Sequence, residues 1–154
     1  MLVRLFKSNH PLAFFIIPGL SVILRIPVLF HTSFAPSSYD SALLTSAFFW
    51  INQYPWLSIL LASFFTSVTA IYLNAISDKH GLLARVSFLA GLSYTLIASI
   101  LPQFAYFSPV YVSSILAVFA FDQVLSLHRD GSGLNQTFNA ALAVGLAAMF
   151  TPAA

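Results

Sequence analysis

Long apolar runs, separated by short polar segments, make up most of this chain of 154 residues. Only 6% of the residues are charged, against about 25% in an ordinary soluble domain, so a surface that faces water cannot be built from them. The runs have about the length that a helix needs to cross a hydrocarbon core of roughly 30 Å. The sequence therefore predicts an all-α fold class, a polytopic transmembrane helical bundle surrounded by lipid.

Residues 1–154 are predicted to form a single transmembrane domain. Four apolar segments are long enough to be spans, at about 12–30, 55–76, 82–101 and 109–127. A fifth, at about 138–150, is short for a full crossing, so it either crosses or stops partway. The basic start and first apolar run look like a signal peptide, but the run is too long and no small-x-small cleavage site follows. This predicts an uncleaved first span.

The basic residues predict the orientation. Lys and Arg accumulate in cytoplasmic loops, and spans alternate in direction. Three segments must then lie on the same side of the membrane: the N-terminal segment, the turn at 77–81 and the segment after 127. Together with their flanks, these segments hold five of the six basic residues. The connections 31–54 and 102–108 have none. We therefore expect a bacterial inner-membrane protein whose N-terminus is cytoplasmic.

The predicted outer loop contains a short amphipathic stretch at about 38–52. Its apolar residues fall on one helical face, and Asp40 and Asn52 lie toward the other. Ser37 or Ser38 can cap this helix, and Trp50 and Tyr54 suit the headgroup region. We expect a helix along the outer membrane surface; the alternative is a re-entrant segment among the spans.

Two polar residues near the outer face are candidates for chemistry. Arg25 lies about one turn from the outer end of the first span, where a charge is costly. It either extends to outer phosphates or pairs with Asp40, or it binds the phosphate of a lipid. Asp40 is the one acidic residue expected outside. It either caps the loop helix or acts as a general base or metal ligand.

Polar residues within the other spans are expected to find partners inside the membrane. Asp122 lies about two turns before Arg129, so this intramembrane aspartate is predicted to pair with Arg129 or His128. The alternative, a proton or ion path, has no continuation in the other spans. Hydrogen bonds between helices are expected from the polar side chains of Asn74, Tyr94 and Gln103.

Several function classes lack support in the sequence. The scattered Lys and Arg residues form no basic stripe, so no nucleic acid is expected as a partner. The chain has no cysteine, and no histidine pair has the spacing of a helical metal site, so no metal site is predicted. Phosphate-binding and dinucleotide-binding motifs are absent, and no cofactor is expected.

Two short motifs carry a resemblance to known families. The segments "LRIPVLF" (Leu24–Phe30) and "YDSALL" (Tyr39–Leu44) resemble the first-loop signature of GT-C glycosyltransferases. In the first of these motifs, Ser41 replaces the acidic residue that usually follows the aspartate. The end "FNAALAVGLAAMFTPAA" resembles a later segment of that superfamily, but it lacks the basic residue of the later turn. The segments "LFKSNHP" and "SPVYVSSILAVFAFDQVLSLHRDG" look similar to an uncharacterised family of inner-membrane proteins of Bacteroidota.

The resemblance to GT-C enzymes implies transfer of a sugar from a polyprenyl-phosphate donor at the outer face, with Asp40 as the catalytic residue. The chain would correspond to the N-terminal half of such an enzyme. The residues themselves favour a different function, because catalysis needs several convergent groups and this chain offers few. We expect a noncatalytic accessory subunit of a larger membrane complex, whose partners are membrane lipids and other membrane-protein subunits. The glycosyltransferase is the alternative.

Overall fold

A computed structural model describes residues 12–30, 51, 53–82, 88–101, 104–130 and 133–150, and over these ranges it contains five α-helices and no β-strand. The expected all-α fold class is therefore confirmed. The helices are α2 (Leu12–Phe30), α4 (Pro55–Lys79), α5 (Leu89–Ile100), α6 (Pro109–Asp130) and α7 (Gly133–Phe150).

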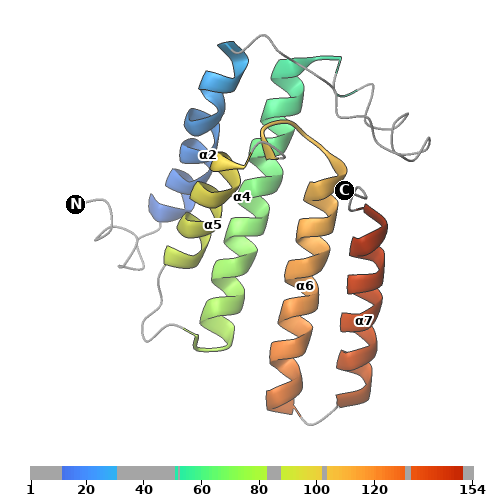
Figure 1. Ribbon diagram of the computed structural model, residues 1–154. Helices are drawn as coiled ribbons and strands as arrows, with labels where there is room; N and C mark the ends of the chain where they lie inside the picture. Colours follow the sequence, from blue (N-terminus) through green and yellow to red (C-terminus); the bar gives the residue numbers. More distant parts are fainter. Residues whose placement is uncertain are drawn as a thin grey trace.

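Helix α4 lies at the centre of the bundle, with α2 and α5 on one side and α6 on the other (Figure 1). Helix α7 packs against α6 at the outer edge. Successive helices run in opposite directions, so the turn after α4 and the connection between α6 and α7 lie at one end of the bundle (Figure 1). The connection between α5 and α6 lies at the other end. This alternation decides which polar side chains can meet.

Two helices are long and apolar enough to cross a membrane: α4 over its whole length, and α6 over Pro109–Leu127. Helices α2 and α5 include shorter apolar stretches. Helix α5 covers only the later part of the segment predicted at 82–101, and Leu82 lies outside any helix. Helix α7 begins earlier than predicted, because Thr137 donates its hydroxyl to the Gly133 carbonyl at 2.6 Å and so fits the first turn. The predicted surface helix at 38–52 lies almost wholly outside the described residues.

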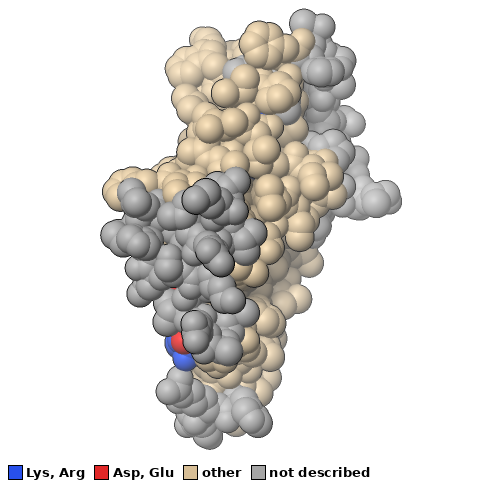
Figure 2. Space-filling model, turned by 90° about the vertical axis from the view of Figure 1, so that its left-hand side faces the viewer, with Lys and Arg blue, Asp and Glu red and all other residues tan. Residues whose placement is uncertain are grey.

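Burial in this bundle departs from the pattern of a soluble protein. Large apolar side chains on the outside are widely exposed, among them Phe30 (78%), Ile100 (80%) and Leu134 (87%). The interior contains Arg25, Asp122 and many hydroxyl groups beside apolar side chains such as Ile17, Ala70 and Ile76. Monomeric soluble proteins rarely expose contiguous apolar patches larger than a few hundred Å². The face in Figure 2 has almost no charged atoms on its described part, apart from one spot near one end.

Hydroxyl groups line the buried side of α4 because the helix satisfies most of them internally. Thr66, Ser67, Thr69 and Ser77 each donate to the carbonyl four residues earlier, at 2.7 to 2.9 Å. Such a bond lets a small polar side chain enter an apolar interior without an unpaired donor. The small side chains also let neighbouring helices approach α4 closely.

Helix α4 ends in a C-terminal capping motif that contains Gly81. Gly81 adopts a positive φ of 63°, a conformation that side chains with a Cβ rarely take. The amide of Leu82 then bonds to the Ser77 carbonyl at 3.0 Å, and the Gly81 amide bonds to the Asp78 carbonyl at 3.3 Å. This pair of bonds is the Schellman motif. It fixes the direction in which Lys79 and His80 leave the helix.

Candidate functional site

Two buried polar clusters connect the helices. The first, termed the arginine cluster, consists of Arg25, Ser21, Thr66, Tyr111 and the carbonyl group of Phe104. These groups come from α2, α4, α6 and the segment before α6. Arg25 is only 1% exposed and is the largest fully buried side chain among the described residues.

The guanidinium group of Arg25 uses all five of its N–H groups inside the protein. Nε donates to the Phe104 carbonyl at 3.2 Å. One terminal nitrogen donates to the carbonyl and the hydroxyl of Ser21, at 3.2 and 2.5 Å. The other donates to the hydroxyls of Thr66 and Tyr111, at 2.7 and 3.0 Å. A guanidinium has five donors and no acceptor, so its hydrogen-bonding capacity is filled.

The three hydroxyls that accept from Arg25 are themselves donors to backbone carbonyls. Tyr111 donates to Phe104 at 2.6 Å, Thr66 donates to Ala62 at 2.8 Å, and Ser21 donates to Ser63 at 3.4 Å. Each hydroxyl therefore carries partial negative charge toward the cation. The network disperses the charge of Arg25 over several oxygens, which is what a buried charge requires in a medium of low dielectric.

Aromatic rings hold Tyr111 in this position. Its ring stacks on Phe107 at a centroid distance of 5.9 Å and meets the edge of Phe104 at 5.2 Å. Before α6, the Phe107 amide donates to the Ser58 hydroxyl at 2.9 Å, which ties this segment to α4. Tyr111 is fully buried as a result.

The sequence hypotheses for Arg25 placed it at the lipid boundary or beside Asp40. The structure directs its guanidinium into the bundle, where each described partner is neutral. Asp40 lies outside the described residues, and binding of a lipid phosphate by Arg25 stays a prediction. No sequence signal singled out Thr66 or Tyr111, because hydroxyl groups are frequent in these spans.

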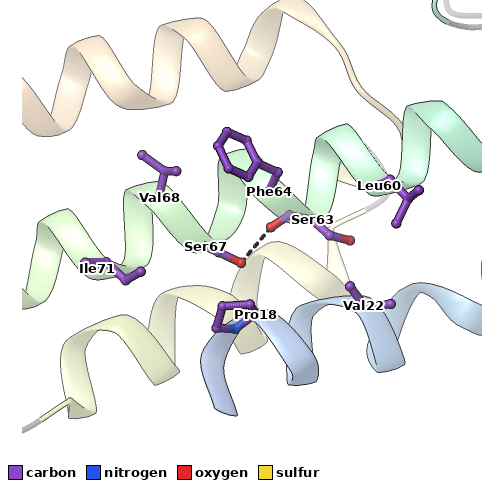
Figure 3. Close-up of a pocket in the computed structure, with 8 residues that line it drawn as sticks. All are labelled: Pro18, Val22, Leu60, Ser63, Phe64, Ser67, Val68 and Ile71. Atoms are coloured by element: carbon purple, nitrogen blue, oxygen red, sulfur yellow. Dashed lines mark hydrogen bonds between the residues drawn. The ribbon is translucent and has the colours of Figure 1, made fainter. Parts of the chain in front are cut away.

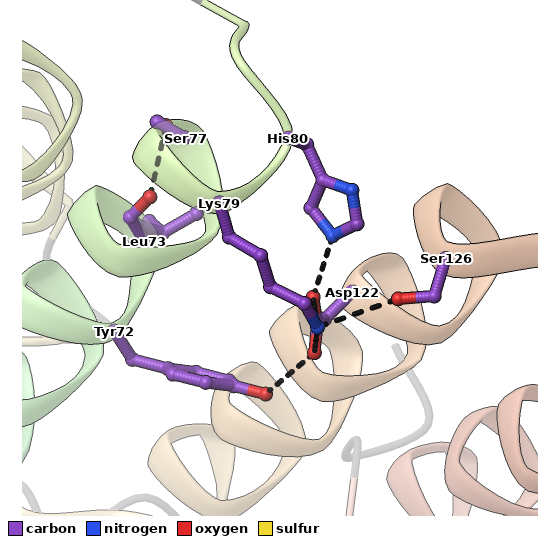
Figure 4. A network of polar contacts seen from close by, with 7 residues as sticks. All are labelled: Tyr72, Leu73, Ser77, Lys79, His80, Asp122 and Ser126. Carbon is purple, nitrogen blue, oxygen red and sulfur yellow. Dashed lines mark hydrogen bonds and ion pairs between the residues drawn. The ribbon is translucent and has the colours of Figure 1, made fainter. Parts of the chain in front are cut away.

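The second group, termed the aspartate cluster, consists of Asp122 and Ser126 on α6 with Tyr72, Lys79 and His80 on or just after α4 (Figure 4). Lys79 Nζ lies 3.0 and 3.1 Å from the two carboxylate oxygens of Asp122. His80 Nε2 lies 2.8 Å from Oδ1. Tyr72 donates to Oδ2 at 3.4 Å, and Lys79 donates to Ser126 at 3.4 Å.

The described partners of Asp122 are residues that the sequence did not suggest, and its predicted pairing with Arg129 or His128 stays a prediction. The predicted partner was Arg129 or His128, but those side chains lie outside the described part of α6. The described partners are Lys79 and His80, which the Schellman turn after α4 directs toward α6. The sequence did not single out either residue as a partner of Asp122. The alternating direction of the predicted spans could have indicated these partners, since it places the end of α4 and the end of α6 on the same side of the bundle.

Asp122→Asn is expected to lower the free energy of unfolding by about 1–2 kcal/mol, because the amide keeps one acceptor but loses the charge that His80 and Lys79 contact. Lys79→Met is expected to cost less than about 1 kcal/mol, since the Lys79 side chain is 53% exposed and its ion pair is screened. Titration with a denaturing detergent measures both. Equal costs for the two variants would contradict a cluster that depends on the buried carboxylate.

Two predicted hydrogen bonds between helices are confirmed. Asn74 on α4 accepts the amide of Gly91 on α5 at 2.8 Å. The hydroxyls of Tyr94 on α5 and Ser114 on α6 lie 2.7 Å apart. The third residue in that prediction, Gln103, lies outside the described residues. Gly91 belongs to the first turn of α5, where amides have no partner within the helix, so Asn74 caps α5 from a neighbouring helix.

The chemistry available in these clusters is limited. The aspartate cluster has one carboxylate, and Lys79 and His80 already contact it. A cavity of about 640 Å³ adjoins the turn, but both Asp78 and Lys79 line it, so it has no dominant charge. Within the described ranges, no three His, Asp or Glu side chains are grouped so that they could hold a metal ion. Asp40, the catalytic residue of the glycosyltransferase alternative, is outside these ranges, and its role stays a prediction.

Comparisons with family models, with curated proteins and with solved structures give no match to this chain.

Proposed function

We propose that this chain is a noncatalytic integral subunit of the bacterial inner membrane, with four spans and a fifth apolar helix, and that it packs against other membrane proteins. Its N-terminus is cytoplasmic. The single observation that supports this best is the burial of charged groups together with the exposure of large apolar side chains. Arg25 and Asp122 are inside, whereas Phe30, Ile100 and Leu134 are exposed. A lipid environment stabilises such a surface, and water does not.

The use of the buried polar groups supports a noncatalytic role. The donors of Arg25 are all occupied, and Asp122 has partners on both of its oxygens. Catalysis requires a nucleophile, base or acid that converges on a space where substrate can react. Both clusters instead join helices to one another. Their contribution is to the stability and geometry of the bundle.

The placement of charge supports the orientation. Lys79 and His80 lie at the end of the bundle where the connection between α6 and α7 is also found (Figure 1). Arg129 lies near that connection in the sequence, and Arg4 and Lys7 precede α2, which begins at the same end. Short loops rich in Lys and Arg remain in the cytoplasm. This end of the bundle is therefore assigned to the cytoplasmic side.

Labelling with cysteine tests the topology. The chain has no cysteine, so Ser37→Cys and Ser132→Cys each provide a unique thiol of the same parent residue. In intact cells stripped of the outer membrane, a maleimide that cannot cross a bilayer is expected to label Ser37→Cys and to leave Ser132→Cys unlabelled. Ser132→Cys becomes labelled once the inner membrane is permeabilised. The reverse pattern would show that the orientation is wrong.

Purification in a mild detergent tests the subunit role. Native mass measurement of the extracted protein is expected to give a complex in which this chain has companions at fixed stoichiometry. A monomer with no companion, extracted under conditions that preserve other inner-membrane complexes, would contradict the proposal. Release from membranes by alkaline carbonate would contradict membrane integration itself.

A further inference from the structure

Helix α6 is fixed firmly where it begins. Tyr111, in its first turn, belongs to an apolar cluster that includes Phe107, and its hydroxyl accepts a hydrogen bond from Arg25 at 3.0 Å. One turn later, the hydroxyl of Ser114 lies 2.7 Å from that of Tyr94 on α5. Buried rings and hydrogen bonds therefore act together at this end of α6.

The later part of α6 contacts α4 in a different way, through the aspartate cluster. Asp122 lies about 16 Å beyond Tyr111 along the helix, at a rise of 1.5 Å per residue. Its contacts there are with Lys79 and His80, and the Lys79 side chain is 53% exposed. Within the described residues, neither apolar core cluster includes a residue of α6 beyond Tyr111. The attachment at this end is therefore mainly polar and is open to solvent on one side.

Helix α7 is joined to α6 and not to the other helices. It packs against α6 through the small buried side chains of Ala140, Ala143 and Ala147 (Figure 1). Such side chains let two helices approach closely. The other described residues of α7 are half-buried or exposed. Helices α6 and α7 therefore form one hairpin, and a movement of α6 carries α7 with it.

Helices α2, α4 and α5 form the unit on which this hairpin rests. Ile17 on α2 and Ala70 on α4 share an apolar cluster with Leu92 on α5. Helix α2 also lies along the buried serines Ser63 and Ser67 of α4 (Figure 3). These three helices are thus held together by a common apolar core as well as by hydrogen bonds.

We propose that the α6–α7 hairpin is hinged at Tyr111 and that the aspartate cluster is the latch that holds it against α4. The inference goes beyond the proposed subunit role but rests on the proposed membrane placement. In lipid, apolar helices gain no hydrophobic stabilisation by packing on one another, so polar contacts have a large share in keeping α6 on α4.

A small rotation is enough to open the latch. A tilt of the hairpin by about 10° at Tyr111 moves Asp122 by about 3 Å, given the 1.5 Å rise per residue. This movement breaks its contacts of 2.8 to 3.1 Å with His80 and Lys79. Ser114 moves by less than about 1 Å in the same tilt, because it is only one turn from the hinge. Its contact with α5 is therefore kept.

Pairs of spin labels on the full chain in lipid vesicles test the hinge. The chain has no cysteine, so cysteines at exposed positions provide defined sites. Ala75→Cys with Leu127→Cys spans the latch, and Trp56→Cys with Met149→Cys spans the opposite ends of α4 and α7. Pulsed electron double resonance measures both distances. With Asp122→Asn, we expect a longer distance at the latch pair, populated about 5–30-fold more than in the parent, and no change at the opposite pair.

Ser114→Ala is the matched control, because it removes a hydrogen bond of α6 beside the hinge and is expected to leave the latch distance unchanged. His80→Leu covers the case in which Asp122→Asn does not fold. It removes one contact of the carboxylate and is expected to raise the open population at least about fivefold.

Three results would overturn the proposal: the same latch distance in every variant, equal opening with Ser114→Ala and Asp122→Asn, or lengthening at both label pairs. The last would show that the whole hairpin separates from α4 without a hinge. Unchanged distances in a protein that stays embedded refute only this inference. Extraction of the chain by alkaline carbonate refutes the proposed membrane placement.

Discussion

Arg25→Ala is expected to lower the free energy of unfolding by about 2–4 kcal/mol, because a fully bonded and fully buried side chain is lost. The substitution removes five hydrogen bonds and leaves a cavity where α2, α4 and α6 meet. Relief from burying a charge offsets part of this loss. Titration with a denaturing detergent in mixed micelles, followed by circular dichroism, measures the change. A cost below about 0.5 kcal/mol, the size of a typical surface substitution, would contradict the network.

A double-mutant cycle with Tyr111→Phe isolates the contact between the two helices. In the wild type, removing the Tyr111 hydroxyl takes an acceptor from a buried cation, which costs about 1.5–3 kcal/mol. In the Arg25→Ala background it costs about 1 kcal/mol, because only the bond to the Phe104 carbonyl remains. Strict additivity would show that Arg25 and Tyr111 do not interact. Tyr54→Phe, at an exposed tyrosine, is the matched control.

Gly91→Ala is expected to destabilise the protein by about 1–3 kcal/mol through overpacking. A Cβ at this position would lie 2.5 Å from Asn74 Nδ2 and 2.6 Å from the carbonyl oxygen of Ala70. The second atom belongs to the backbone of α4, so the helices α4 and α5 must separate. Their separation also weakens the bond between the Gly91 amide and Asn74. The same detergent titration measures the loss.

Gly145→Ala is the matched control for this prediction. A Cβ at Gly145 meets nothing within 4 Å, and the residue is exposed on α7. Alanine restricts the unfolded chain and favours the helix, so a gain of about 0.5–1 kcal/mol is expected. If both variants destabilise the protein equally, the cost at Gly91 does not come from the close approach of α4 and α5.

The position of most helices follows from the sequence. The apolar runs predicted the bounds of α2 and the start of α6 correctly. A helix with a largely apolar outer surface needs a long apolar segment, and hydropathy detects such a segment. The exact start of α5 did not follow, since the apolar run continues through the residues before Leu89. The start of α7 was also missed. Its first turn is polar, and hydropathy does not identify such a turn as helical.

The polar clusters were predictable only in part. Asn74, Tyr94 and Asp122 were identified as groups that need partners, because an isolated polar side chain is costly within a membrane. Which partner each one meets depends on the order and rotation of the helices, and a single sequence does not encode these in a local pattern. Arg25 illustrates this best. The two hydroxyls that it meets on α4 and α6 are 41 and 86 residues away, and none of its described partners is acidic.

These sequence separations have a consequence for biosynthesis. Arg25 belongs to α2, which is translated before α4 and α6, so Thr66 and Tyr111 leave the ribosome much later. During translation the cation therefore has only Ser21, on its own helix, as one of its final partners. A cation that is buried without its full set of acceptors is costly. Under the proposed membrane placement, α2 gains its full stability only after the nascent chain has delivered α6, and a ribosome stalled before that point would leave α2 prone to leave the membrane again.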